Sequence, residues 1–385
     1  MKIIDLFAGC GGLALGFKEQ NFETLAFLEW EKACIDTLRA NFEEIKPTPL
    51  FLHKDIQDTQ GCTEAEDGNL ADLITDVGGL DGVIGGPPCQ AYSMAGRVRD
   101  PLGMTQDYRN FLFEAYCRIL AKFKPSFFVF ENVTGLLSAK PNGFPITQEI
   151  EKAFDANGYY CGKINKDIVY DFADLGGPQR RKRVIIFGVR KDVQKCEQRV
   201  STFHEKMRSL RCKNQTVQDA IGDLAPIFPL PEDERSARLS HANLSNDWMH
   251  HSRFHNDRDM KIFELLANDL KTPNPRYTSI EAIKQLYKDK VGKEAAVHKY
   301  YVLRENEASN LIPAHLHKDG LRHIHPDPTQ SRTITAREAA RLQTFPDDYL
   351  FKGSRSDVFK MIGNAVPPLF AEKVAKCVRA ALKDE

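Results

Sequence analysis

The sequence predicts a doubly wound, Rossmann-like α/β sheet with helices on both faces, joined to a second, smaller and irregular domain. Short apolar and β-branched runs recur through the first half of the chain and alternate with helical patterns. These runs are apolar throughout, as in strands that are buried on both faces of a parallel sheet. The first run ends in a glycine-rich turn that leads into a helix, a connection that lets the backbone approach a ligand closely.

The same patterns place the individual elements. Strands are expected at residues 2–8, 24–30, 82–86, 127–133 and 183–189, and helices at 34–42 and 110–123. Beyond residue 190 the chain has scattered prolines and no clear period, and it regains regularity at 333–345 before a final amphipathic helix at 358–382. We therefore expect a first domain at 1–190, a second at 191–330, a joining helix within 331–357, and a segment at 358–385 that returns to the first domain.

Composition and charge limit the class of protein. The 385 residues are 42% hydrophobic and 28% charged, as in an ordinary globular protein. No apolar run approaches the roughly 18 residues of a membrane span, and the chain enters a strand pattern directly, so neither a membrane segment nor a signal peptide is expected. Nine cysteines without a C-x-x-C pair argue against a disulfide framework and a structural zinc site. Because the net charge is zero, any nucleic-acid surface has to be a local patch.

The first candidate ligand site is the turn in DLFAGCGGLALGF, residues 5–17. Glu29 follows twenty residues after the first glycine, where a carboxylate often accepts hydrogen bonds from ribose hydroxyls. Trp30 could stack on an adenine ring, and Asp55 could accept from an adenine amino group. By itself this loop does not separate a dinucleotide from S-adenosylmethionine. Its glycines are Gly9, Gly11 and Gly12.

The second candidate is Cys89 in DGVIGGPPCQAYS. The two prolines fix the direction of the backbone and leave a thiol at the carboxyl end of a strand, where open α/β sheets bind ligands. Such a thiol can act as a covalent nucleophile if its surroundings lower its pKa or relieve the negative charge that its attack creates. The alternative is a small buried side chain, which is the interpretation we prefer for most of the other cysteines.

Two further stretches place charged side chains at the ends of strands. Glu131 and Asn132 end the apolar strand FFVFENV, where a carboxylate is either partly desolvated or paired with a cation. In GGPQRRKRVIIFGV, strand alternation directs Gln179, Arg181 and Arg183 to one face. These arginines could hold a polar ring and pair with Glu131, although a simple charged edge strand would give the same pattern.

Together these motifs resemble those of the DNA (cytosine-5) methyltransferases, and they occur in that family's order. The matching stretches are FAGCGG, EW, DI, PPCQAYS, ENV, QRRKR, RTITAREAARLQTFPD and GNAVPP. The resemblance covers residues 1–190 and about 330–385, while 191–330 takes the place of the family's target-recognition domain. It implies an S-adenosylmethionine-dependent methyltransferase that acts on double-stranded DNA.

The resemblance also implies roles for individual residues. The thiolate of Cys89 would add to carbon 6 of a cytosine flipped out of the duplex, which makes carbon 5 nucleophilic. Glu131 would hold or protonate ring N3, and Arg181 and Arg183 would steady the base and that carboxylate. The residues expected to bind the cofactor are Phe7, Gly9, Gly11, Gly12, Glu29, Trp30, Asp55, Ile56, Pro88, Leu112, Asn364, Ala365 and Val366.

Three further polar segments are expected to play different roles. Residues 91–110 are long and aperiodic, as in a loop that closes on DNA, and the residues expected to contact DNA are Gln90, Ser93, Arg97 and Arg99. A solvated surface loop is the alternative. Arg337, Glu338 and Arg341 fall at helical spacing, which favours an ion-paired helix that braces the second domain. The histidine cluster HHSRFH lacks zinc-type ligand spacing, and no metal is expected.

We expect a bacterial cytoplasmic enzyme of a restriction-modification system, monomeric, with no membrane contact. A cognate restriction endonuclease would act on the same site without touching it. The nearest alternative is a tRNA cytosine-5 methyltransferase, but that branch typically carries a Cys-Phe-Thr signature, which this chain lacks. A NAD-dependent oxidoreductase would explain the glycine loop alone. A catalytically dead DNA reader is disfavoured because Cys89, Glu131, Arg181 and Arg183 are all present.

Overall fold

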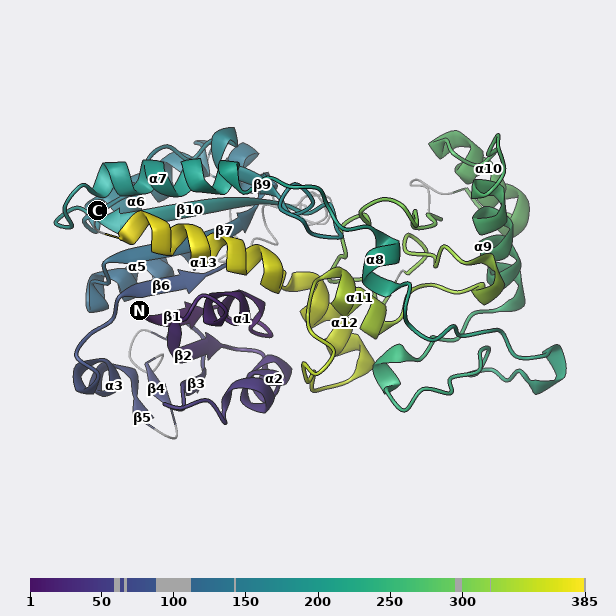
Figure 1. Cartoon of the computed structure of the whole chain (residues 1–385), viewed down its shortest axis with the longest axis horizontal. Coiled ribbons are helices and arrows are strands. Elements are labelled where there is room, and N and C mark those ends of the chain that lie inside the picture. The colour runs from purple at the N-terminus through teal and green to yellow at the C-terminus, as the bar shows by residue number, and fades with distance from the viewer. Residues whose placement is uncertain are drawn as a thin grey trace.

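A twisted, mainly parallel sheet forms the larger part of the molecule (Figure 1). The computed structural model describes residues 1–58, 63–65, 68–87, 112–141, 143–294, 300–318 and 320–383. Within these residues the sheet has eight strands, and a separate two-stranded ribbon lies beside it. The sheet strands are β1 (Lys2–Leu6), β2 (Glu23–Glu29), β3 (Leu50–His53), β6 (Gly82–Gly85), β7 (Phe127–Val133), β8 (Tyr159–Tyr160), β9 (Val169–Asp171) and β10 (Lys182–Arg190), and the ribbon is β4 (Glu64–Ala65) with β5 (Gly68–Asn69).

The strand order confirms the doubly wound prediction. The path through the sheet is β3-β2-β1-β6-β7-β10-β8, with β9 paired to β10. From β3 to β7 the pairs are parallel, whereas β10 runs antiparallel to β7. The chain winds outward from β1 to β3 and then resumes at β6 on the other side of β1. The carboxyl ends of β1 and β6 therefore flank the switch point, where folds of this kind bind their ligands.

Helices cover both faces of the sheet because neighbouring strand residues are buried on opposite sides. Ile4, Phe128 and Phe130 contribute to a core with the helices of one face, and Ile3 and Phe127 contribute to a core with the helices of the other. On the first face lie α3 (Leu70–Asp76), α5 (Leu112–Phe123) and α6 (Ile146–Ala156), and on the second α1 (Gly12–Lys18), α7 (Cys196–Ser209) and α13 (Pro368–Leu382).

The C-terminal helix α13 packs between α1 and α7, as the sequence predicted for a segment returning to the first domain (Figure 1). Gly16 makes this packing possible, since an added Cβ would lie 2.4 Å from both the Pro368 carbonyl oxygen and the Glu372 nitrogen. Helix α7 also packs on β10, although it lies beyond the predicted limit at residue 190. Its apolar residues join the sheet core, so the first domain extends to Ser209.

The second part of the molecule is less irregular than the sequence suggested. It contains α9 (Asp257–Leu270) and α10 (Ile280–Val291), which share a small core with residues 300–324. The sequence does contain a helix pattern for α9, because Asn256 is a favourable N-cap residue and the apolar residues Met260, Phe263 and Leu266 recur every three positions. The other short elements of this second part are α8 (Val217–Ile221), η4 (Glu232–Glu234), η5 (Trp248–His250) and η6 (Pro328–Gln330), whereas η2 (Thr134–Ser138) and η3 (Lys166–Ile168) belong to the first part.

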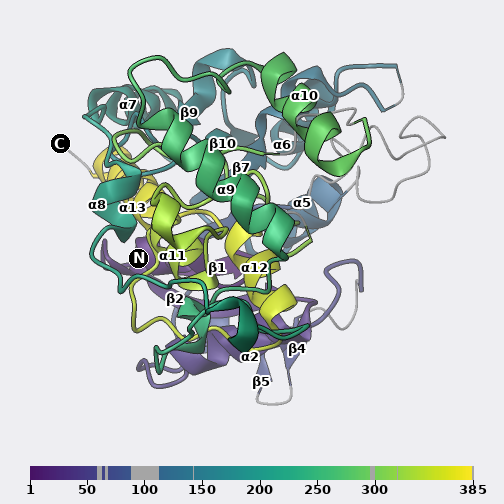
Figure 2. The ribbon, with the colours of Figure 1, turned by 90° about the vertical axis from the view of Figure 1, so that its right-hand side faces the viewer.

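A central layer joins the two parts. It is made of α2 (Lys32–Phe42), α11 (Ala336–Leu342) and α12 (Arg355–Asn364), which share one apolar core with strand β2 and with residues of the second part. Figure 2 looks onto the second part and shows α9 and α10 in front, with α11 and α12 between them and the sheet. Because α11 and α12 bury apolar side chains on both sides, they fix how the second part is attached.

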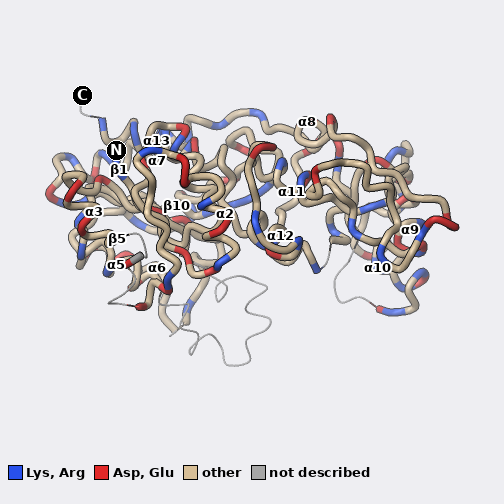
Figure 3. The backbone as a smooth tube through the Cα atoms, turned by 90° about the horizontal axis from the view of Figure 1, so that it is seen from below, with Lys and Arg blue, Asp and Glu red and all other residues tan. Residues whose placement is uncertain are grey.

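Charged residues of both signs are distributed over the whole molecule (Figure 3). This mixture agrees with the zero net charge of the chain. Among the described residues, no helix has the length and apolar character that crossing a membrane requires.

Candidate active site

Two loops meet at the switch point of the sheet. Leu6 at the end of β1 is paired with Gly85 at the end of β6, so the segments after them start side by side. One segment is the glycine-rich turn at residues 7–12, and the other is Gly86–Pro87, which leads toward the Pro-Pro-Cys motif. Gly85 is needed here because an added Cβ would lie 2.4 Å from the Leu6 carbonyl oxygen.

The glycine-rich turn is built from left-handed backbone conformations. Phe7, Gly9 and Gly11 have φ values of 56°, 54° and 82°. At Gly11 an added Cβ would lie 2.8 Å from Leu38 Cδ2, so only glycine fits both the conformation and the space. The first N–H groups of α1 follow directly, which makes this turn a concave surface with backbone donors.

Glu29 is held against this turn. One carboxylate oxygen accepts the Gly9 N–H at 2.8 Å, and the other accepts the N–H groups of Trp30 and Glu31 at 2.9 Å each. Burial raises the pKa of Glu29, and the three backbone donors oppose that rise. The predicted carboxylate therefore lies at the turn. Trp30 beside it is 62% exposed, so its ring is free to stack on a ligand.

The ends of β1, β3 and α5 converge on one side of the turn. Ile56, just after β3, and Leu112, the first residue of α5, are buried in one apolar cluster, against which Phe7 packs. Asp55 is exposed, and its carboxylate accepts the Gln57 N–H at 2.9 Å. These residues come from three separate segments, yet they border the same edge of the sheet.

The segment GNAV lies on the other side of the turn. An added Cβ at Gly12 would lie 2.3 Å from the carbonyl oxygen of Val366, so the two backbones are in contact. Ala365 is buried, and Asn364 is exposed at the end of α12. The structure thus brings residues near position 365 to the glycine turn, as the sequence predicted.

A buried ion pair lies at the ends of β7 and β10. Glu131 Oε1 is 2.7 Å from Arg183 Nε, and the two side chains are 12% and 11% exposed. Of the two alternatives that the sequence left for Glu131, the structure shows pairing with a cation. The antiparallel register places Ile185 opposite Glu131, so Arg183 lies two residues along its strand on the same face.

The chain that leads to Cys89 runs directly past this pair. At Gly86 an added Cβ would lie 2.7 Å from Glu131 Oε2, so a side chain there would collide with the carboxylate. Asn132 Nδ2 donates to the Pro87 carbonyl oxygen at 3.4 Å. The glycine before the two prolines, which the sequence analysis read only as part of a turn, therefore makes room for Glu131.

Arg181 has a different environment from the one expected for it. Its side chain is directed inward like Gln179 and Arg183, whereas Arg180 and Lys182 are exposed, as alternation predicted. Its hydrogen bonds, however, go to the backbone carbonyls of Ile312 in the second part and of Gly363 and Ala365 at the end of α12, and not to Glu131. The role of Arg181 beside the base remains a prediction.

Several predicted residues lie outside the described part of the chain. They are Pro88, Cys89, Gln90, Ser93, Arg97 and Arg99. Their assignments as cofactor-binding, catalytic and DNA-binding residues remain predictions from the sequence.

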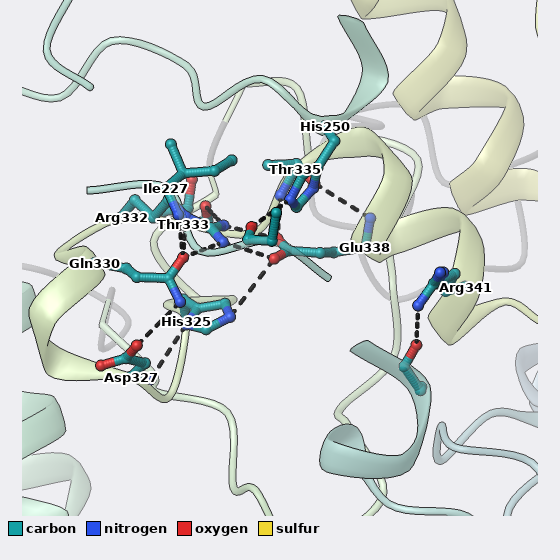
Figure 4. Close-up of polar contacts among 12 residues, drawn as sticks. Ile227, His250, His325, Asp327, Gln330, Arg332, Thr333, Thr335, Glu338 and Arg341 are labelled. Atoms are coloured by element: carbon teal, nitrogen blue, oxygen red, sulfur yellow. Dashed lines mark hydrogen bonds and ion pairs between the residues drawn. The ribbon is translucent and has the colours of Figure 1, made fainter. Parts of the chain in front are cut away.

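A buried polar network anchors the second part to α11 (Figure 4). Arg332 forms two hydrogen bonds of 2.7 Å with the Glu338 carboxylate, and Gln330 Oε1 accepts from the same guanidinium. Burial favours a higher pKa for Glu338, but Arg332 and the Thr335 N–H outweigh it and hold the pKa well below its usual range. Arg332 is the first residue of the RTITAREAARLQTFPD motif, but the motif gave no sign that its side chain is buried, and Gln330 was not singled out at all.

The predicted bracing by α11 is observed. Arg337 Nε is 2.7 Å from Asp247 of the second part, and Arg341 pairs with Asp223 and Asp347. Glu338 caps its own helix through a reciprocal bond with Thr335. These ion pairs therefore connect α11 to the second part, with the arginine side chains mostly buried and their carboxylate partners partly exposed.

The histidines of HHSRFH contact backbone groups. His250 Nε2 lies 2.8 Å from the Ala225 carbonyl oxygen, His251 Nε2 lies 2.7 Å from the Ser245 carbonyl oxygen, and His255 Nε2 accepts the Thr333 N–H at 3.2 Å. Within the described ranges, no three metal-binding side chains come together.

Four buried histidines should make the stability depend on pH. Burial lowers the pKa of His241 and His325 to about 4, of His323 to about 3 and of His255 to about 2. The unfolded chain, with histidine pKa values near about 6.5, binds protons that the folded chain does not. The free energy of unfolding should therefore fall as the pH drops from about 6.5 toward 4, by about 2 kcal/mol for each histidine that stays neutral.

Urea denaturation at a series of pH values measures this dependence. A His255→Gln variant keeps an acceptor for the Thr333 N–H, and its free energy of unfolding should depend less steeply on pH than that of wild type. His53→Gln changes an exposed site outside the network, and its pH dependence should equal that of wild type. A free energy of unfolding that stays constant from pH 7 to about pH 5 would contradict the expectation.

Comparisons with known proteins place this arrangement in context. A family model described as C-5 cytosine-specific DNA methylase matches residues 1–379. The Type II methyltransferase M.Bpa9945I of Bacillus paralicheniformis is 31% identical, over 98% of each chain. The Type II methyltransferase M.NgoPII of Neisseria gonorrhoeae is also 31% identical, over 100% of this chain and 96% of that one.

Solved structures show the same fold. A prophage-encoded Escherichia coli protein assigned as a DNA modification methyltransferase superposes with a TM-score of 0.62 at 25% identity, over 99% of each chain. The methyltransferase EhMeth of Entamoeba histolytica gives a TM-score of 0.58 over 100% of this chain and 99% of that one, and at 14% identity it supports the fold alone.

Proposed function

Because the chain belongs to the C-5 cytosine-specific DNA methylase family, it is a DNA cytosine-5 methyltransferase, and we propose that S-adenosylmethionine is its methyl donor. We propose further that the cytosine is flipped out of a specific site in double-stranded DNA, at a cost of a few kcal/mol. The family model and the Type II relatives favour DNA over tRNA as the substrate.

The residues around the glycine turn fit S-adenosylmethionine. The left-handed turn at Gly9 and Gly11 brings the backbone close to a ligand, and Glu29 lies where sugar hydroxyls would be held. Trp30 and Ile56 would enclose the adenine, and Asp55 would accept from its amino group. When bound, the cofactor supplies an electrophilic methyl group on a sulfonium sulfur. The other residues proposed to contact it are Phe7, Gly12, Pro88, Leu112, Asn364, Ala365 and Val366.

The chemistry on the base would be carried by Cys89 and Glu131. The Cys89 thiolate adds to carbon 6, and the electron pair of the C5–C6 double bond moves into the ring while Glu131 holds or protonates N3. Carbon 5 would then bond to the methyl carbon as the carbon–sulfur bond breaks, which leaves a neutral thioether, S-adenosylhomocysteine. A base removes the proton from carbon 5, the double bond forms again, and the Cys89 thiolate leaves. Arg183 keeps Glu131 oriented through their 2.7 Å contact.

DNA would be held between the two parts of the molecule. We propose that residues from about 210 to 330 form the target-recognition domain and that Gln90, Ser93, Arg97 and Arg99 contact the substrate. Residues 331–357 would join the domains, and 358–385 would return to the first. The Type II relatives support a restriction-modification role. We propose a monomeric enzyme in a bacterial cytoplasm, with an endonuclease that acts on the same site without contact.

The observation that carries the proposal is the position of Glu131 and Arg183 against Gly86, on the segment leading to Cys89 and next to the glycine turn. Bisulfite sequencing of plasmid DNA from cells that express the protein tests it. One cytosine within one recurring sequence should resist conversion, and plasmid from cells with an empty vector should convert fully. Complete conversion in both samples would contradict the proposal.

A further inference from the structure

Arg181 occupies the point where three segments of the chain meet. Its side chain is 2% exposed, and no carboxylate among the described residues forms an ion pair with it. Nη1 donates to the Ile312 carbonyl oxygen at 3.2 Å, and Nη2 donates to the carbonyl oxygens of Gly363 and Ala365 at 2.9 Å each. One guanidinium therefore links the sheet to the second part and to the GNAV segment.

The two backbone segments that Arg181 joins are also packed on each other. An added Cβ at Gly363 would lie 2.4 Å from the Pro313 carbonyl oxygen and the Ala314 nitrogen. Residue 312 belongs to a stretch that pairs with the sheet, since the Arg180 N–H donates to the Ser309 carbonyl oxygen at 2.9 Å. The end of α12 is thus held between Arg181 and residues 312–314.

Gln179 extends the same junction. Its side-chain oxygen accepts the Ile312 N–H at 3.1 Å, and its amide nitrogen donates to the Leu342 carbonyl oxygen at 3.2 Å and to Gln343 Oε1 at 3.0 Å. Gln343 in turn donates to the Ile362 carbonyl oxygen. The loop before β10 therefore binds residues 312 and 342 directly, and it is linked through Gln343 to Ile362, the residue before the GNAV segment.

The geometry suits arginine alone. A planar guanidinium presents several donors in fixed directions, whereas a lysine ammonium is one point charge and cannot reach three separated carbonyls at once. Without those donors, the Ile312, Gly363 and Ala365 carbonyl oxygens would lose their partner in a buried site, which is costly. The turn at residues 363–365 would then relax away from the sheet.

We propose that Arg181 is a positioning residue, which fixes residues 363–365 so that Asn364 is presented to the cofactor beside the glycine turn. The inference rests on the proposed function, because it takes Asn364 as a cofactor contact. Arg181 acts through backbone carbonyls, and among the described residues the ion pair of Glu131 is with Arg183. Arg181 therefore governs cofactor affinity, and Arg183, which contacts Glu131, governs the chemical step.

Arg181→Lys and Arg181→Met variants of the full chain test this assignment. The dissociation constant of S-adenosylhomocysteine and the KM for S-adenosylmethionine should each rise at least about tenfold, as loss of several charge-assisted hydrogen bonds predicts. At saturating cofactor, kcat should stay within about threefold of wild type. Arg180→Met, at the exposed neighbouring position, is the matched control and should change neither quantity.

The outcomes separate this inference from the proposed function. If wild-type protein fails to bind S-adenosylhomocysteine, the proposed function is wrong. If wild type and the variants bind S-adenosylhomocysteine equally well, the positioning role is wrong. If the variants instead lose kcat with an unchanged KM, a role of Arg181 at the base is indicated. Circular dichroism verifies that the variants are folded.

A measurement on wild-type protein alone avoids any folding defect of the variants. Amide hydrogen exchange should slow in residues 309–316 as well as 363–366 when S-adenosylhomocysteine is added, because Arg181 joins the two segments. Slowing confined to 363–366 and the glycine turn would overturn the inference.

Discussion

Replacing Cys89 with serine is expected to lower DNA methylation by about a thousandfold or more while leaving cofactor binding nearly unchanged. A serine hydroxyl is close to a thiol in size but is a far weaker nucleophile without a strong base beside it, so the addition at carbon 6 should fail. Transfer of tritiated methyl groups to DNA measures the first effect, and titration with S-adenosylhomocysteine measures the second.

The control for this experiment is Cys212→Ser, which changes an exposed cysteine of the second part. That variant should methylate DNA at the wild-type rate. Turnover by Cys89→Ser within about tenfold of wild type would rule out covalent catalysis by this residue.

A DNA substrate with 5-fluorocytosine at the target site gives an independent test. Fluorine on carbon 5 cannot leave as a proton does, so the base should remain bonded to the Cys89 sulfur after methyl transfer. The adduct should survive denaturation and appear by mass spectrometry on the peptide that contains Cys89. An adduct on another of the nine cysteines would show that the nucleophile was assigned wrongly.

Replacing Glu131 with glutamine should lower kcat by about a hundredfold to ten-thousandfold, the range for loss of a positioned acid or base. Glutamine keeps the size of the side chain but cannot balance charge at ring N3. It also leaves the Arg183 guanidinium, 11% exposed, without the carboxylate that now lies 2.7 Å from its Nε. Cofactor affinity should be little changed, because the proposed role of Glu131 is to hold ring N3 of the base and not the cofactor.

Single-turnover methylation at saturating DNA and cofactor measures this effect. Lys182→Met is the matched control, since Lys182 precedes Arg183 on the same strand but is exposed on the opposite face. Arg183→Lys should give an intermediate loss, because it keeps a positive charge but not the donor geometry. A single-turnover rate for Glu131→Gln equal to that of wild type would remove Glu131 from the mechanism.

Much of the first domain could be predicted because its strands are locally encoded. Runs such as the start of FFVFENV have apolar side chains at consecutive positions, and a strand buries all of them only when both faces of its sheet are covered. The positions of Gly9 and Glu29 also followed, since the strands that carry them are adjacent and parallel and therefore end at the same edge. The pairing of Glu131 with Arg183 was proposed from strand alternation, and it is observed.

Other features could not be predicted, because their partners are far away in the sequence. Arg181 and Arg183 look equivalent in QRRKR. Arg181, however, donates to the carbonyls of residues 312, 363 and 365, whereas Arg183 pairs with Glu131. Helix α7 has few apolar residues, and only its contact with β10 and α13 assigns it to the sheet. Gln330 shows no distinctive local pattern, yet its side-chain oxygen accepts both the Ile227 N–H, 103 positions away, and the buried Arg332 guanidinium.

The sequence by itself determined the sheet and the glycine turn, because strand periodicity and turn residues are properties of short segments, and the catalytic roles of Cys89 and Glu131 remain predictions from it. The tertiary structure alone decided which of two neighbouring arginines holds the carboxylate and which holds the C-terminal segment. It also decided that the buried histidines and Arg332 stabilise the joint between the domains. Those outcomes depend on packing between segments that are distant in the sequence, such as Arg181 with residues 312, 363 and 365 or His255 with Thr333, and no local pattern records it.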